Sequence, residues 1–195
     1  MVAPVKVNFK VYQGSTFKEV LRWESATKQY KAISSITKSA PIEITSPSHG
    51  IPVGWRVLVT NVLGMKEINS ADNYQTVTST TTDTVTFNAI NALGYTDYVS
   101  GGVLEYNSPN SLAGVTARMQ VREKITSDTL IDELTTENGK LVIDDTLKTI
   151  SIVVSAADTA AYTFNSAVYS MELINGIEVT PFIYGDLTLQ REITR

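Results

Sequence analysis

Apolar and polar residues alternate without interruption in the stretch Thr116-Ala117-Arg118-Met119-Gln120-Val121-Arg122. Because successive side chains of a β-strand point to opposite faces of its sheet, this period of two predicts a strand with one buried and one solvated face. A helix would instead repeat its apolar residues every three to four positions. The stretch therefore predicts a sheet that covers a core on one side only.

The same alternation recurs on both sides of this stretch. It runs over residues 5–11 and 17–23, on either side of Gly14-Ser15, which predicts a hairpin. Helix signal is limited to residues 155–161, which begin with a capping serine, and to a short turn over 64–69. Further strands are predicted over residues 55–60, 83–87, 141–143, 149–154, 168–173 and 182–189.

Many short strands separated by turn residues predict an all-β fold, either a sandwich or a barrel. The composition also changes along the chain, because residues 33–106 are rich in Ser, Thr, Asn and Gly, whereas the strands outside are longer and more charged. Two consecutive domains would explain this change, and so would one domain inserted into a loop of another. The pattern alone favours neither arrangement.

The composition excludes several kinds of chemistry. The chain has 195 residues, of which 43% are hydrophobic and 18% charged, and this is the balance of a folded protein. It has no cysteine and one histidine, which excludes disulfides, thiol nucleophiles and multi-histidine metal sites. The net charge of −4 is the wrong sign for holding phosphate backbones. There is also no signal-peptide pattern and no apolar stretch long enough to span a bilayer, so we expect no membrane partner. From the composition and charge we expect no cofactor, metal or nucleic acid.

Few side chains are candidates for catalysis. His49 is the only imidazole base, and it lies in the turn Ser46-Pro47-Ser48-His49-Gly50, where a structural role is expected. Asp144-Asp145 reads best as a polar hairpin turn, and no calcium-loop pattern accompanies it. Gly101-Gly102 precedes an apolar strand and not a lysine and a helix, so it is not a phosphate loop. The other carboxylates considered are Glu137, Asp128, Asp132 and Glu133. We therefore expect no enzymatic activity.

Tyr95, Tyr98 and Tyr106 gather near one end of the Ser/Thr-rich region. If they are exposed, such tyrosines can stack on sugars or anchor a protein partner. The alternative is that they complete the core of a small domain. Both interpretations stay open at this stage.

The C-terminal segment alternates to its last position, with Leu187, Leu189, Arg191 and Ile193 on one predicted face. A strand that runs to the end of a chain needs a partner to hold it. We expect this strand to lie in a sandwich near an interface, with Arg191 and Arg195 placed to meet an acidic surface.

The outer segments resemble a module common in tailed-bacteriophage virion proteins. The residues that carry the resemblance include Tyr12-Gln13-Gly14-Ser15-Thr16-Phe17, Leu112-Ala113-Gly114-Val115-Thr116-Ala117-Arg118 and Tyr169-Ser170-Met171-Glu172-Leu173. They are similar to the N-terminal domain of lactococcal phage baseplate upper proteins, which implies an immunoglobulin-like β-sandwich. In that family a short turn joins the segment ending near Trp23 to the one beginning near Leu112. Here about 90 residues intervene, far more than in an ordinary loop.

The intervening residues are similar to another small domain. Ser48-His49-Gly50-Ile51-Pro52-Val53-Gly54, Val62-Leu63-Gly64-Met65-Lys66 and Tyr98-Val99-Ser100-Gly101-Gly102 carry this resemblance. The domain is small and β-barrel-like, and it is named after the first catalytic-cysteine half-domain of ubiquitin-activating enzymes. The two resemblances imply a discontinuous sandwich domain of residues 1–28 plus 108–195 and an inserted domain of residues 29–107.

The resemblances imply a structural role in a virion. The expected function is a non-enzymatic component of the tail, baseplate or neck that acts through protein–protein interfaces. Its expected partners are other virion proteins and further copies of itself in a symmetric ring or array. It would be made in the host bacterial cytoplasm and reside in the virion. Capsid decoration and carbohydrate binding by an adhesin module are the alternatives.

Overall fold

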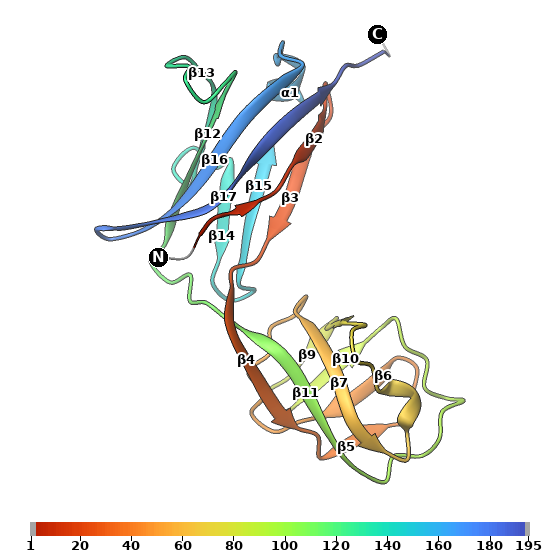
Figure 1. The fold of residues 1–195 in the computed structure, drawn as a ribbon. Coiled ribbons are helices and arrows are strands. Elements are labelled where there is room, and N and C mark those ends of the chain that lie inside the picture. Colours follow the sequence, from red (N-terminus) through yellow and green to blue (C-terminus); the bar gives the residue numbers. More distant parts are fainter. Residues whose placement is uncertain (1–2, 194–195) are drawn as a thin grey trace. The chain divides into compact units, whose positions relative to one another are not determined.

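The computed structural model describes residues 3–193, and it divides the chain into two compact units. The first unit combines the segment up to Trp23 with the segment from Ser111 onward, and the second is Glu24–Asn110. Each unit has its own cluster of buried apolar side chains. The fold is nearly all β, which confirms the predicted class (Figure 1).

The first unit is a sandwich of two sheets. In its larger sheet, the strands follow the order β1-β17-β16-β12-β13, and β2 also pairs with β17. β1 and β2 run parallel to β17, and the other neighbours are antiparallel. The strands are β1 (Val5–Lys6), β2 (Phe9–Tyr12), β12 (Thr116–Arg122), β13 (Leu130–Thr135), β16 (Ser166–Asn175) and β17 (Glu178–Gln190).

The smaller sheet shows that the predicted hairpin over residues 5–23 is wrong. It contains β14 (Leu141–Asp144), β15 (Thr149–Val154) and β3 (Phe17–Leu21), so β2 and β3 belong to different sheets. The turn at Gly14 carries the chain across the sandwich. This lets Phe9 and Phe17 meet edge to face in the core from opposite sheets, with ring centroids 5.6 Å apart.

The core of the first unit follows the predicted alternation. In β12, Ala117, Met119 and Val121 are buried, whereas Arg118 is exposed on the other face. The short helix α1 (Ala156–Ala160) lies where the sequence predicted it, and the hydroxyl of Ser155 accepts a hydrogen bond from the Asp158 amide as its N-cap.

The edge beside β17 explains why the strand predicted over residues 5–11 is broken into β1 and β2. A Cβ at Gly185 would overlap the Val7 carbonyl oxygen, so only glycine lets the two backbones approach this closely. The Val7 amide donates to the Tyr184 carbonyl at 2.8 Å, and the Asp186 amide donates to the Asn8 side chain at 3.0 Å. The segment between β1 and β2 therefore stays hydrogen-bonded to β17.

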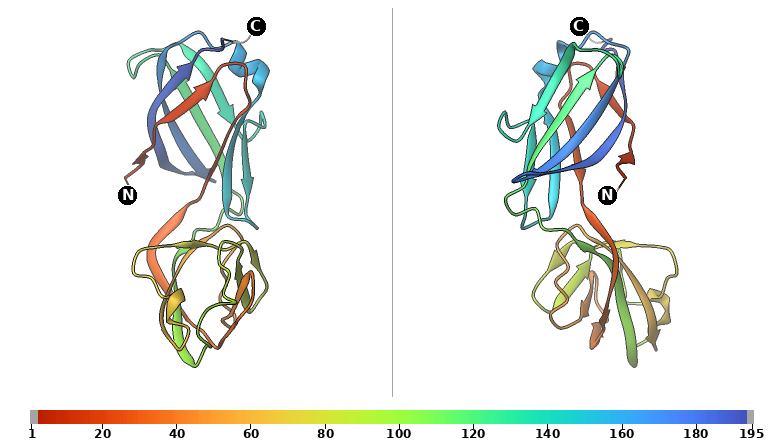
Figure 2. Two further views of the ribbon diagram at one scale, coloured as in Figure 1. Left: turned by 90° about the vertical axis from the view of Figure 1, so that its right-hand side faces the viewer. Right: turned by 60° about the vertical axis from the view of Figure 1, so that its left-hand side comes forward.

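The second unit is built from two four-stranded sheets. One has the order β4-β11-β7-β8 and the other β5-β6-β10-β9. The chain passes between the two sheets four times, at β4 to β5, β6 to β7, β8 to β9 and β10 to β11 (Figure 2). The two sheets do not close into one barrel. The elements are β4 (Glu24–Ala32), β5 (Ser35–Thr37), β6 (Ile42–Thr45), β7 (Arg56–Leu63), η1 (Lys66–Ile68), β8 (Gln75–Thr76), β9 (Ser79–Thr80), β10 (Thr84–Phe87) and β11 (Ser100–Pro109).

The strands that enter and leave the second unit pair with each other. In the β4–β11 ladder Ala32 lies opposite Val103, and at its far end Glu24 lies opposite Pro109. This ladder belongs to the second unit, which is why the division falls at residues 23/24 and 110/111 and not at 28/29 and 107/108. Entry and exit are thus adjacent, as an inserted domain requires.

Candidate functional site

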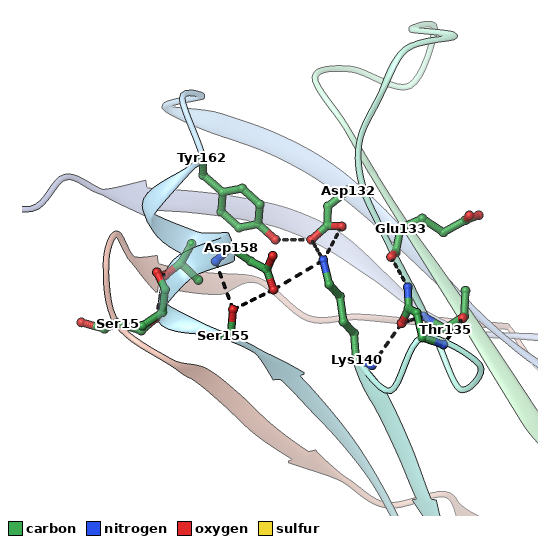
Figure 3. Close-up of polar contacts among 11 residues, drawn as sticks. Ser15, Asp132, Glu133, Thr135, Lys140, Ser155, Asp158 and Tyr162 are labelled. Atoms are coloured by element: carbon green, nitrogen blue, oxygen red, sulfur yellow. Dashed lines mark hydrogen bonds and ion pairs between the residues drawn. The ribbon is translucent and has the colours of Figure 1, made fainter.

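Figure 3 shows a group of polar side chains of the first unit that bond to one another around Asp132. Lys140 donates to both carboxylate oxygens of Asp132 on β13, at 2.8 and 3.0 Å, and its ammonium lies 3.8 Å from Asp158 of α1. The Tyr162 hydroxyl donates to the same Asp132 carboxylate. Ser155 donates to Asp158 at 2.8 Å. The group therefore connects β13, the residue before β14 and the helix.

The side chains of this network are bonded to one another. Burial, and then the hydrogen bond to Asp132, raise the pKa of Tyr162, so the phenol stays protonated. The Lys140 side chain is held by ion pairs with Asp132 and Asp158, at 2.8 and 3.8 Å. Asp132 was a sequence candidate, but Lys140 and Tyr162 were missed because they are separated from it by 8 and 30 residues.

Two of the other predicted carboxylates, Asp144 and Asp145, accept hydrogen bonds at the turn between β14 and β15. Asp144 accepts hydrogen bonds from the Thr146 and Leu147 amides, both at 2.9 Å, which confirms the polar hairpin turn between β14 and β15. The ammonium of Lys148, and then the Leu112 amide, hold the pKa of Asp145 below its ordinary value. Among residues 3–193, no group of three or more His, Asp or Glu side chains gathers to hold a metal ion.

His49 is a buried structural side chain with 2% of its surface exposed. Its Nδ1 accepts from the Ile51 amide at 2.9 Å, so Nε2 carries the hydrogen and donates to the Thr84 carbonyl at 3.2 Å. Burial lowers the pKa of His49 below its ordinary value of 6.5. Nε2 thus connects the predicted turn to β10, and Nδ1 bonds within the local chain at Ile51.

The three predicted tyrosines do not form one exposed surface. Tyr106 is 3% exposed, and its hydroxyl donates to the His49 carbonyl. Tyr98 is half-buried and donates to the Gly101 carbonyl at 2.9 Å. Only the half-buried Tyr95 lines a cleft. Tyr106 therefore belongs to the core of the second unit, and Tyr95 and Tyr98 pack against that core.

The predicted C-terminal strand ends earlier than expected. β17 stops at Gln190, and Ile193 is 89% exposed. The Arg191 guanidinium donates to the Thr163 carbonyl at 2.6 Å, so it serves a contact within this chain. Arg195 lies outside the described residues.

The second unit has a polar cleft of about 370 Å³ next to Tyr95. Glu67 forms part of its wall, and its Oε1 accepts from the amide and the hydroxyl of Thr96, both at 2.8 Å. Hydrogen bonds from its own backbone amide, and then from the amide and the hydroxyl of Thr96, lower the pKa of Glu67. The lining also includes Ile68, Asn69, Ser70, Asn73, Gln75, Ala89 and Ile90.

The first unit has a groove of about 400 Å³ on the solvent face of its larger sheet. Lys6 and Asp186 form an ion pair of 3.0 Å there. Arg122 donates to the Ser127 carbonyl at 2.8 Å and to the Gln120 side chain at 3.0 Å. The remaining lining residues are Ile125, Val168, Tyr169, Ser170, Tyr184 and Gly185.

No protein-family model matches this chain, and a search of curated proteins found no match. The similarity to phage modules therefore stays a prediction from the residues. Among the described residues, no helix is long and apolar enough to span a bilayer. What is established is the all-β fold and the contacts of each candidate side chain.

Proposed function

We propose that this protein is a non-enzymatic structural component of a tailed-phage virion that acts through protein–protein interfaces in the tail, baseplate or neck. The observation that carries the proposal is the insertion of one compact unit into another through a single pair of adjacent strands, with Glu24 opposite Pro109. This leaves the sandwich with both sheets and its own core. One unit is then available to dock on a neighbouring subunit while the other presents a second surface.

The use of the titratable side chains also supports a non-enzymatic role. Asp132, Lys140 and Tyr162 bind one another, and His49 uses both nitrogens within the second unit. A catalytic base or nucleophile needs a free, correctly protonated atom that faces substrate. These side chains are engaged in the fold instead.

Purified particles of the phage that encodes the chain provide the test. We expect mass spectrometry to find its peptides at a constant ratio to the major tail protein across a density gradient. A gold-labelled antibody should bind at the tail, baseplate or neck. Labelling over the capsid would support capsid decoration instead. Infectious particles that lack the chain would contradict a virion role.

A carbohydrate-binding role for the second unit is favoured by one observation, the polar cleft beside Tyr95. The ring offers an apolar face of the kind on which sugars stack, and Glu67 is a carboxylate already oriented by Thr96. The side-chain amides of Asn73 and Gln75 form no hydrogen bond with other described residues, so they are free to bind hydroxyl groups.

Saturation-transfer NMR with hexoses and N-acetylhexosamines tests this second candidate. We expect transfer to at least one sugar, and its loss in Tyr95→Ala and Gln75→Ala. Tyr30→Ala is the matched control, because Tyr30 is 62% exposed in the same unit and does not line the cleft. Absence of transfer to every sugar, or transfer that both cleft variants retain, would contradict carbohydrate binding.

A further inference from the structure

The turn between β16 and β17 carries an isoleucine that contributes nothing to the core. Ile177 is 100% exposed, and Val179 beyond it is 54% exposed. β12 pairs with β16 only as far as Ile174, and β1 pairs with β17 only from Ile183. The end of the hairpin, residues 175–179, therefore projects past its neighbouring strands (Figure 1), and we call it the tip.

A single exposed isoleucine is ordinary on a protein surface, so the tip alone indicates nothing. The same sheet also has a groove on its solvent face, with apolar side chains in its lining. Ile125, which is 89% exposed, and Tyr184, which is 44% exposed, line this groove together with Val168. Its volume of about 400 Å³ suits a small group of apolar side chains.

The charges of the tip and the groove are complementary. Among the described residues, the carboxylate of Glu178 at the tip forms no ion pair. In the groove, Asp186 is already paired with Lys6, whereas Arg122 binds only the neutral oxygens of Ser127 and Gln120. The groove therefore has a guanidinium without a carboxylate, and the tip has a carboxylate without a cation.

A chain cannot fill its own groove with its own tip. Both lie on one sheet, and seven residues of β17 separate Ile177 from Tyr184. At about 3.3 Å per residue this is a separation of about 23 Å along a strand that is held on both sides near the groove. A tip that fills this groove must therefore belong to another molecule.

We propose that the tip of one copy of this protein docks into the groove of a second copy. Ile177 and Val179 pack on the apolar lining, and Glu178 forms an ion pair with Arg122. A pair of copies joined by one such contact keeps one tip and one groove free, so further copies can add head-to-tail and build a ring or a filament. The inference rests on the proposed assembly through protein–protein interfaces and names the surface that does it.

Sedimentation velocity of the full chain over a wide concentration range tests the proposal. We expect self-association beyond the dimer, weakened at least tenfold by Ile177→Asp and by Arg122→Glu. Ile193→Asp is the matched control, because Ile193 is 89% exposed in the same unit and belongs to neither surface. Circular dichroism and thermal unfolding confirm that each variant keeps its fold.

Mixing the two variants gives the sharpest result. Ile177→Asp keeps an intact groove and Arg122→Glu keeps an intact tip, so their mixture should form a one-to-one dimer and nothing larger. A wild-type chain that stays monomeric, or an association that both variants retain, would overturn the proposal. Neither result would affect the particle experiment, so a failure here is distinguishable from a failure of the proposed function.

Discussion

At the scale of single residues, His49 shows how a polar side chain is accommodated in the core of the second unit. Its ring is 2% exposed and bonds to the Ile51 amide and the Thr84 carbonyl. The uncharged form fits these contacts, because one nitrogen accepts and the other donates. A second proton would remove the acceptor that the Ile51 amide needs.

This arrangement predicts that the second unit loses stability in mild acid. Burial lowers the pKa of His49 in the folded state, so the unfolded chain takes up a proton first. The stabilisation is fully present above the unfolded pKa of about 6.5 and declines as the pH falls through the lower folded value. Urea unfolding followed by Trp55 fluorescence in a Trp23→Phe background measures it. His49→Gln should cost about 1–3 kcal/mol at neutral pH and flatten the acid decline. An equally steep loss of stability in acid in that variant would show that groups other than His49 cause it.

The network around Asp132 makes a second prediction at this scale. Tyr162→Phe removes a hydrogen bond to a carboxylate and should destabilise the first unit by about 1.5–3 kcal/mol. Thermal unfolding measures the loss. Tyr12→Phe is the control, because Tyr12 is 55% exposed in the same unit, and it should unfold like the wild type. Equal effects of the two substitutions would show that the network does not stabilise the sandwich.

Local contacts explain which of these residues could be predicted from the sequence. Asp144 bonds amides two and three residues away, and His49 bonds the Ile51 amide two residues away, so this turn chemistry is visible in the sequence. The bond of His49 to Thr84 is not local and could not be predicted from the turn. The contacts of Asp132 come from other elements of the sandwich. Nothing in the local pattern around Lys140 or Tyr162 indicates them.

At the scale of elements, alternation predicts a strand only where one face is buried. β12 and β15 alternate in burial and lie where the sequence predicted them. β4 was missed because its nine residues are exposed or half-buried on both faces, so its sequence carries no period. The β2–β3 error has another cause, since alternation on both sides of a turn does not say whether the strands share a sheet.

The end of β17 makes a prediction with an internal control. Leu189 is 6% exposed and lies opposite Val11, whereas Ile193 is 89% exposed beyond the strand. Leu189→Ala should therefore lower the free energy of unfolding of the first unit by about 2–5 kcal/mol. Ile193→Ala should change it by less than about 0.5 kcal/mol. Chemical denaturation of both variants measures the difference, and comparable losses would mean that Ile193 packs as the sequence alternation first indicated.

At the scale of the whole molecule, the insertion could be predicted only from the order of the family-like segments. Composition left consecutive and inserted domains equally open, because both place a Ser/Thr-rich region inside a more charged chain. The division lies at residues 23/24 and 110/111, because β4 and β11 pair along their length and take the junction segments into the second unit. Strand pairing between segments about 80 residues apart is not a local signal.

The same pairing predicts that the sandwich folds without the insert. Glu24 lies opposite Pro109, so the ends left by deleting residues 24–110 are close, and a two-residue Gly-Asn turn replaces a ladder that serves only the second unit. Trp23 is then the sole tryptophan, and it packs on the first core with its ring 6.3 Å from that of Phe182. We expect one cooperative unfolding transition, followed by Trp23 fluorescence and by circular dichroism. The full chain in a Trp55→Phe background is the reference. A deleted chain that is unfolded where this reference is folded would show that the sandwich depends on the unit it carries.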